Sequence, residues 1–422
     1  MYKKTILDNG LTLVTNRMPH MESVAVGIWI NTGSRNEIKE NSGISHFLEH
    51  MLFKGTASRS CRKLKEEIEG RGGSLNGFTS EEISCFLSKV SIKHLDIALD
   101  VLSDMVLNAS IAEKDVERER AVIIEEIKMY QDLPNQHVHD ILSEIMWPDH
   151  QLGRPIAGDI ETVTFITPKD IHQYKNANYI PGNIVIVLCG NLDHEAAAKK
   201  VSTIFKNKTG QSRRHFSIFH NTQAKPCIKI LRKETEQTHM CMGLHSFGKT
   251  HKDRFVASLL HIILGANMSS RLFENIREKK GLAYEIGTEI RKYRETGAFI
   301  VHAGIEHKNV RETIRVILQE LKKIKNEEVS AGELKRAKEF FKTQLLMALE
   351  DTLELMLWLG EYMITLGKLP DKNEIVNKIE AVKAKDIRRV ADTIFKPSHL
   401  NIALIGEIRD EEEKAIDRDL GL

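Results

Sequence analysis

The chain has 422 residues, enough for two to four domains of ordinary size. Hydrophobic residues make up 41% and charged residues 28% of the composition, which is typical of a globular protein with a core and excludes a disordered chain. The 61 basic and 59 acidic side chains leave a formal charge of +2, so the overall charge disfavours nucleic acid or an anionic membrane as the main partner.

The cysteines and the apolar runs indicate a compartment. Five cysteines are present without a C-x-x-C pair, which predicts free thiols in a reducing environment. The first ten residues lack the apolar core of a signal peptide, and the longest apolar runs are far shorter than a membrane span. We therefore expect a cytoplasmic protein, or a mitochondrial matrix protein whose presequence has been removed, with no membrane partner.

The first half of the chain mixes short strands with long helices. Two apolar runs around Asn9-Gly10 predict a hairpin at residues 6–14, and an apolar strand follows at 24–30. Another strand closes this half at 184–189. Apolar residues at helical spacing predict helices over residues 43–53, 61–71, 92–107 and 113–130.

The second half begins after a polar, basic stretch at 206–226, the best candidate for a linker. We divide the chain into an N-terminal half at 1–207, a linker at 208–226 and a C-terminal half at 227–422. The charged tail from residue 407 predicts a solvated helix. In the second half, strands are predicted at 228–232, 239–245, 297–304 and 400–405, and helices at 253–264, 270–279, 310–325 and 332–365.

A weak internal repeat relates the two halves at an offset of about 216 residues. Residues 169–171, of sequence KDI, recur at 385–387, and the strand closed by Gly190 recurs as the strand closed by Gly406. Each match is feeble alone, but chance matches would scatter in offset. The sequence therefore predicts an α+β protein with two homologous halves, each a mostly antiparallel sheet packed with long helices.

The sequence HFLEH at residues 46–50 contains candidate metal ligands and a candidate catalytic base. His46 and His50 share one face of the predicted helix, and two imidazoles one turn apart can bind the same zinc ion. Glu49 lies on the same side and could accept a proton from an attacking water, in the inverted H-x-x-E-H order. Ser42 or Ser45 could cap the start of this helix.

A zinc site needs a third protein ligand, and the acidic helix at 113–130 supplies candidates. Glu119 and Glu126 are two turns apart and therefore share a helix face. Spacing alone does not choose between Glu125 and Glu126, and a solvated acidic face is the alternative interpretation. At the repeat offset, His46 and His50 correspond to apolar residues 262 and 266. A feature needed only for the repeated fold would more often occur in both halves.

The sequence resembles the pitrilysin/insulinase-type zinc peptidases, in particular their mitochondrial-processing-peptidase-like branch. The resemblance runs essentially from end to end. It is carried by LDNGL at 7–11, GSRNE at 33–37, GISHFLEHMLFKGT at 43–56, SSRLF at 269–273 and REKKGLAY at 277–284.

This resemblance implies a zinc metalloendopeptidase that binds one zinc ion per chain through His46, His50 and Glu126. It also implies that Glu49 is the catalytic base and that Glu119 supports the site without being a principal ligand. The implied substrates are unfolded or presequence-like peptides, enclosed in a chamber between two halves that close like a clamshell. Because the chain carries a complete set of site residues, we expect a homodimer of self-sufficient subunits.

The resemblance also implies where the substrate binds. The segment GGSLNGFT at 72–79 resembles the edge strand that receives the peptide, so Leu75, Asn76, Gly77 and Phe78 are implied substrate contacts. The family usually has alanine at the position of Gly77. In the second half, the residues at the positions of Arg277 and Tyr284 reach across to the zinc site and hold substrate in the family.

Two alternatives compete with a peptidase. Some relatives are non-catalytic interaction subunits, but these typically lack parts of H-x-x-E-H or its distal glutamate, and both are present here. A nucleic-acid-binding module is suggested only by basic residues in the linker, and the balanced total charge disfavours it. Those basic residues are Lys206, Lys208, Arg213, Arg214 and His215.

Overall fold

The structure, a computed structural model, describes residues 2–211 and 216–420. They form two compact units, each assembled from three segments of the chain. Unit 1 comprises Met1–Lys128, Arg154–Ser217 and Leu346–Pro370, and unit 2 comprises Met129–Gly153, Ile218–Leu345 and Asp371–Leu422. The division predicted from the sequence, at 1–207 and 227–422, differs because each half of the chain contributes one segment to the other unit.

Unit 1 is built on a six-stranded sheet with the order β1-β2-β6-β3-β5-β4. The predicted hairpin is confirmed, since β1 and β2 pair antiparallel across a turn in which Gly10 has a φ of +91°. Only the pairing of β2 with β6 is parallel among the described strands of this sheet. The strands are β1 (Tyr2–Ile6), β2 (Thr12–Arg17), β3 (Ser23–Ile30), β4 (Ser74–Thr79), β5 (Ser84–Ser91) and β6 (Ile184–Gly190).

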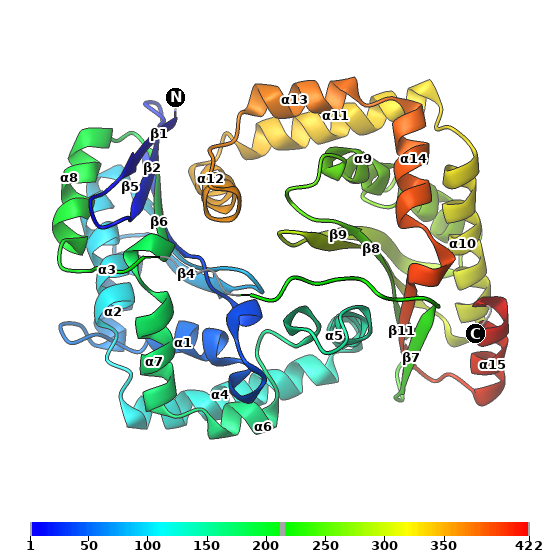
Figure 1. The fold of residues 1–422 in the computed structure, drawn as a ribbon, viewed down its shortest axis with the longest axis horizontal. Coiled ribbons are helices and arrows are strands. Elements are labelled where there is room, and N and C mark those ends of the chain that lie inside the picture. Colours follow the sequence, from blue (N-terminus) through cyan, green and yellow to red (C-terminus); the bar gives the residue numbers. More distant parts are fainter. Residues whose placement is uncertain (1, 212–215, 421–422) are drawn as a thin grey trace. The chain divides into compact units, whose positions relative to one another are not determined.

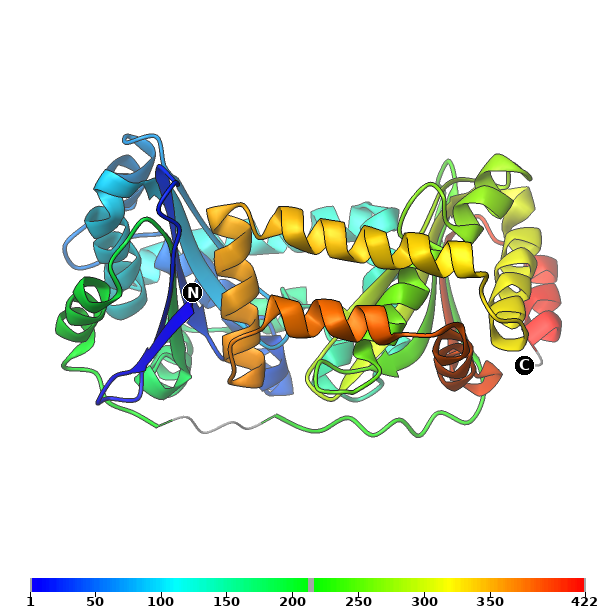
Figure 2. The same ribbon diagram turned by 90° about the horizontal axis from the view of Figure 1, so that it is seen from above.

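Helices cover both faces of the first sheet. One face packs against α3 and α8, and the opposite face packs against α12, which comes from far along the chain (Figure 1, Figure 2). The side chains of β3 alternate accordingly, with Val26 and Ile28 in the first layer and Ala25 and Trp29 in the second. The helices of unit 1 are α1 (Ile44–Leu52), α2 (Cys61–Glu69), α3 (Leu95–Asn108), α4 (Glu113–Asp132), α6 (Ile160–Phe165), α7 (Pro168–Asn178), α8 (His194–Phe205) and α12 (Thr352–Leu366).

Unit 2 repeats this topology. Its five-stranded sheet has the order β7-β11-β8-β10-β9, which matches the order β2-β6-β3-β5-β4 of unit 1. The pair β7–β11 is parallel, as is its counterpart β2–β6. The predicted repeat and the α+β class with two homologous halves are therefore confirmed. The strands are β7 (Cys227–Arg232), β8 (Thr238–Phe247), β9 (Ala283–Lys292), β10 (Thr296–Ile305) and β11 (Leu400–Gly406).

The helices of unit 2 also lie on both faces of its sheet. Helix α5 covers one face, and α9, α10 and α14 lie on the other (Figure 1). The tail forms a helix, as predicted. The helices are α5 (Pro134–Met146), α9 (Arg254–Leu264), α10 (Val310–Asn326), α11 (Ala331–Ala348), α13 (Lys372–Ala381), α14 (Ala384–Ile394) and α15 (Asp410–Leu420).

Two helix predictions in the second half were wrong in detail. The single helix expected at 332–365 is two helices, because the chain leaves α11 after Ala348 and Asp351 caps a new helix by accepting from the N–H groups of Leu353 and Glu354. The helix expected at 270–279 contains a π-helical turn, η6 (Phe273–Glu278). The described part of the linker, 208–211 and 216–226, contains no helix or strand, and Arg213, Arg214 and His215 lie outside the described residues.

Two glycines allow α12 to approach the first sheet closely. A Cβ atom on Gly360 would lie 2.1 Å from the indole of Trp29, and one on Gly27 would lie 2.2 Å from the sulfur of Met356. The Trp29 side chain is only 2% exposed and cannot move aside without displacing its neighbours. Helix α12 thus completes the core on this face of the sheet.

We predict that Gly360→Ala lowers the free energy of unfolding. Overpacking against Trp29 should cost about 1–3 kcal/mol, more than the helix-propensity gain of up to about 1 kcal/mol. The matched control is Gly332→Ala in α11, where a new Cβ would have only the flexible side chain of Arg336 within 4 Å, at 3.6 Å. Urea unfolding should show a loss for Gly360→Ala and no loss for the control. Equal stability of the two variants would contradict the packing argument.

Candidate metal centre

Helix α1 places the H-x-x-E-H residues on its accessible side. Its buried side chains include Phe47, Leu48, Met51 and Leu52, which join the core between α1 and the first sheet. His46, Glu49 and His50 are only partly buried and occupy the remaining face of the helix. The amphipathic pattern of nine residues is therefore sufficient to direct the three polar side chains to one site.

The start of α1 is held by a buried carboxylate. The carboxylate oxygens of Glu37 accept hydrogen bonds of 2.8 Å from the backbone N–H groups of Gly43 and Ser45. The expectation that Ser42 or Ser45 caps this helix was wrong, because the Ser45 hydroxyl bonds instead to the Tyr174 hydroxyl, at 2.7 Å. Burial raises the pKa of Glu37 to about 7, although the hydrogen bonds from Ser45 and Gly43 favour the ionised form.

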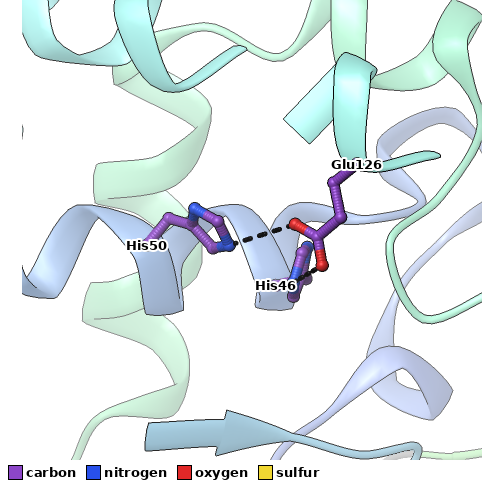
Figure 3. Close-up of side chains that lie close together, drawn as sticks. All are labelled: His46, His50 and Glu126. Carbon is purple, nitrogen blue, oxygen red and sulfur yellow. Dashed lines mark ion pairs between the residues drawn. The ribbon is translucent and has the colours of Figure 1, made fainter. Parts of the chain in front are cut away.

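Glu126, from α4, meets the two histidines of α1. Its carboxylate oxygens lie 3.8 Å from His46 Nε2 and 3.5 Å from His50 Nε2, and Figure 3 shows the three side chains pointing toward one another. Glu125, which spacing alone could not exclude, is exposed and pairs with Lys128 at 2.7 Å. Among the described residues, His46, His50 and Glu126 are the one group of three His, Cys, Asp or Glu side chains that could hold a metal ion.

This geometry fits a zinc ion. One ligand atom from each of the three residues lies within 4.8 Å of the other two. Two donors that each lie about 2.0–2.2 Å from a tetrahedral zinc ion are about 3.3–3.6 Å apart, so side-chain adjustments of about 1 Å or less would bring the three donors to one zinc ion. Burial, with His50 nearby, lowers the pKa of His46 to about 4. The imidazole of His46 is therefore neutral at physiological pH, as metal binding requires.

Glu119 contacts His50 at Nδ1, the ring nitrogen that does not face Glu126. Its carboxylate lies 3.1 Å from His50 Nδ1, so the Nδ1–H can donate to it and leave Nε2 free to bind a metal. The other Glu119 oxygen pairs with Lys54 at 2.5 Å, a contact that sequence reasoning missed. Lys54 follows the H-x-x-E-H run by one helical turn, and this spacing was the available signal. His46 Nδ1, by contrast, is buried without a hydrogen-bond partner among the described residues.

Glu49 lies beside the metal-binding group and is held by a second missed residue. The hydroxyl of Thr79 donates a hydrogen bond of 2.6 Å to Glu49 Oε2. Burial raises the pKa of Glu49, and the hydrogen bond from Thr79 opposes that shift. A carboxylate in this environment can both accept and return a proton.

The predicted edge strand is confirmed. Strand β4 is the last strand of the first sheet, and its residues Leu75 to Phe78 pair on one side with β5. A Cβ atom on Gly77 would lie 3.1 Å from the Phe53 ring and 3.2 Å from the Phe86 ring. A methyl group at this position would therefore be in tight contact with both rings and would require them to shift by tenths of an ångström.

Arg277 and Tyr284 lie together in unit 2. The guanidinium carbon of Arg277 lies 5.1 Å from the centre of the Tyr284 ring and 4.8 Å from that of Phe273. The Tyr284 side chain is 75% exposed at the start of β9, the edge strand of the second sheet. Such an exposed aromatic and cation pair is available for contact with a ligand.

Comparisons with known proteins identify the family of this chain. Residues 12–160 match the family model for Insulinase (Peptidase family M16), and residues 166–341 match that for the Peptidase M16 inactive domain. The chain is 36% identical to the uncharacterized zinc protease YmxG of Bacillus subtilis, over 96% of this chain and 98% of that protein. It is 32% identical to an uncharacterized zinc protease of Streptomyces coelicolor, over 97% and 90% of the two chains.

A solved structure shows the same fold. A protease from Helicobacter pylori superposes with a TM-score of 0.91 at 22% sequence identity, covering 96% of this chain and 99% of that one. The chain belongs to peptidase family M16, the insulinase-type peptidases. The family resemblance found in the sequence is thereby confirmed, while the narrower processing-peptidase-like branch stays a prediction.

We predict that Glu37→Ala destabilises the protein. The substitution leaves the buried N–H groups of Gly43 and Ser45 without an acceptor, which should lower the free energy of unfolding by about 2–4 kcal/mol. Glu40→Ala is the matched control, because Glu40 is exposed three residues away, and its effect should stay within about 0.5 kcal/mol. Denaturant unfolding of both variants measures the difference, and a Glu37→Ala variant as stable as the control would refute the capping role.

Proposed function

We propose that this protein is a zinc metalloendopeptidase. The observation that carries the proposal is the convergence of Glu126 on the Nε2 atoms of His46 and His50, with Glu49 on the same helix face. We assign His46, His50 and Glu126 as the ligands of one zinc ion per chain. Membership of family M16 and relatives named zinc proteases support the metal and the reaction class.

Glu49 is the proposed general base. One of its oxygens, Oε2, accepts from Thr79, while Oε1 has no hydrogen-bond partner among the described residues and can accept the proton of the attacking water. When bound, zinc supplies Lewis acidity toward the water and the scissile carbonyl. Glu49 then returns the proton to the leaving amine, so the peptide bond is exchanged for a carboxyl and an amino group with one water consumed.

The proposed substrates are unfolded or presequence-like polypeptides in an extended conformation. Strand β4 ends the first sheet, and an extended peptide could add to it through main-chain hydrogen bonds that tolerate many sequences. Arg277 and Tyr284 are the proposed additional contacts, supported by their stacked and exposed arrangement. That these two residues act at the zinc site, and that the peptide is enclosed in a chamber, stay predictions.

Several broader expectations remain predictions as well. In the described parts of the chain, no helix combines the length and apolarity needed to cross a bilayer. The homodimer and the cytoplasmic or matrix location stay predictions, as does the absence of nucleic acid among the partners. A non-catalytic interaction subunit is disfavoured because the base and all three candidate ligands lie in one place.

We predict that Glu126→Gln lowers zinc affinity by at least tenfold, because an anionic ligand is replaced by a weakly coordinating amide. Its matched control is Glu125→Gln, the neighbouring carboxylate that points to solvent and pairs with Lys128. Zinc content after dialysis against graded chelator should fall for Glu126→Gln alone. If both variants retain zinc like the wild type, the ligand set is wrong.

We predict that Glu49→Gln keeps zinc but loses peptidase activity by at least a hundredfold, because the amide cannot accept the proton. Hydrolysis of an unfolded peptide library should be followed with and without a chelator, with Glu125→Gln as the active control. Stoichiometric zinc in the wild type without cleavage of any peptide would favour the non-catalytic alternative. Persisting hydrolysis in zinc-loaded Glu49→Gln would contradict the assignment of the base.

A further inference from the structure

We infer that Thr79 is a positioning residue that fixes the Glu49 carboxylate relative to strand β4. The inference deepens the proposed function and rests on it. Thr79 is the last residue of β4, and its hydroxyl is 2.6 Å from Glu49 Oε2. One side chain therefore joins the strand proposed to align the peptide directly to the group proposed to activate water.

The position of the Thr79 hydroxyl is set by the backbone. Thr79 pairs with Ser84 in the ladder between β4 and β5, and the next residue, Ser80, closes a tight turn by donating its N–H to Ile83 O at 2.8 Å. Threonine has a stiff χ1 because it is branched at Cβ, so a fixed backbone also fixes its hydroxyl. The donor is thus held in place before any substrate arrives.

The turn after β4 is itself clamped. The N–H of Ser34 donates to Ser80 O at 3.2 Å, and the N–H of Arg35 donates to Glu81 O at 2.7 Å. Gly33 is required at this approach, since a Cβ atom there would lie 2.1 Å from Ser80 O. These contacts join the segment 33–37 to the turn.

The same segment holds the helix that carries the base. Glu37 lies two residues after Arg35, and its carboxylate accepts from the N–H groups at the start of α1. The contacts form a closed ring within unit 1. It runs from Glu49 through Thr79, the turn and the segment 33–37 to Glu37, and from there along α1 back to Glu49.

The ring has a consequence for catalysis. With Oε2 engaged by Thr79, the rotation of the carboxylate is restricted and Oε1 is the oxygen available to accept a proton. A substrate peptide paired with β4 advances about 3.3 Å per residue. A base fixed at residue 79 therefore selects the substrate peptide bond that lies opposite the C-terminal end of β4. Thr79 thereby sets the register between the bound peptide and the water, and the hydroxyl does not need to touch either.

The test compares Thr79→Val with Thr79→Ser in the full-length, zinc-loaded protein. Valine keeps the shape and removes the donor, whereas serine keeps the donor and removes the methyl group. We expect kcat on an unfolded peptide to fall about ten- to a hundredfold in Thr79→Val, which corresponds to the loss of one hydrogen bond to a charged group. KM and zinc content should stay within about threefold of the wild type, and Thr79→Ser should recover most of kcat.

The matched control is Thr203→Val, an exposed threonine on α8 whose hydroxyl bonds only to Lys199 O of its own helix, and it should leave kcat and KM unchanged. Should Thr79→Val fail to fold, Thr79→Ala takes its place beside Thr79→Ser. Wild-type kcat in the variants that lack the hydroxyl, or a serine variant as slow as they are, would overturn the inference. An inactive wild type would instead overturn the proposed function itself.

Discussion

The site depends on one interaction, the approach of Glu126 from α4 to two imidazoles one turn apart on α1. Neither helix presents all three candidate ligands alone, because α1 supplies the two imidazoles and α4 supplies the Glu126 carboxylate. The approach is possible because both helices bury apolar side chains in the core of unit 1, with Phe47 and Leu48 from α1 and Ile123 and Ile127 from α4. Burial also keeps His46 neutral, so the packing that positions this ligand prepares it chemically.

The two units share one sheet topology, but among the described residues the candidate metal-binding group lies in unit 1. Both sheets keep the same strand order around one parallel pair, and each ends in an edge strand, β4 or β9. In unit 2 the residue that corresponds to His46 at the repeat offset of 216 is Ile262, which is buried and apolar. The repeated scaffold therefore does not specify the chemistry, which depends on a few side chains of the first copy.

The two units are not consecutive stretches of chain. Helix α12 supplies Leu355, Met356 and Leu359 to the core on the Trp29 face of the first sheet, and α5 covers a face of the second. A chain that ended near residue 207 would expose that face of the unit that carries the candidate site. The C-terminal half is thus needed for the stability of unit 1, apart from any contact with substrate.

Local patterns in the sequence determined much of this protein. Apolar periodicity located α1, α4 and most central strands, and the spacing of His46, Glu49 and His50 placed them on one helix face before any fold was known. The family resemblance added Glu126 and the edge strand to the predicted site, because a resemblance over the whole chain includes residues that are far apart in the sequence.

Only the tertiary structure decided the contacts between distant segments. It showed Glu126 beside His50 and Glu125 paired with Lys128, and it replaced the expected serine cap with Glu37. It also revealed Thr79 beside Glu49. It placed α5, from the first half of the chain, in unit 2, and α12, from the second half, in unit 1. Periodicity and spacing report only on neighbours along the chain, whereas these contacts depend on how whole helices and strands pack, which no local pattern encodes.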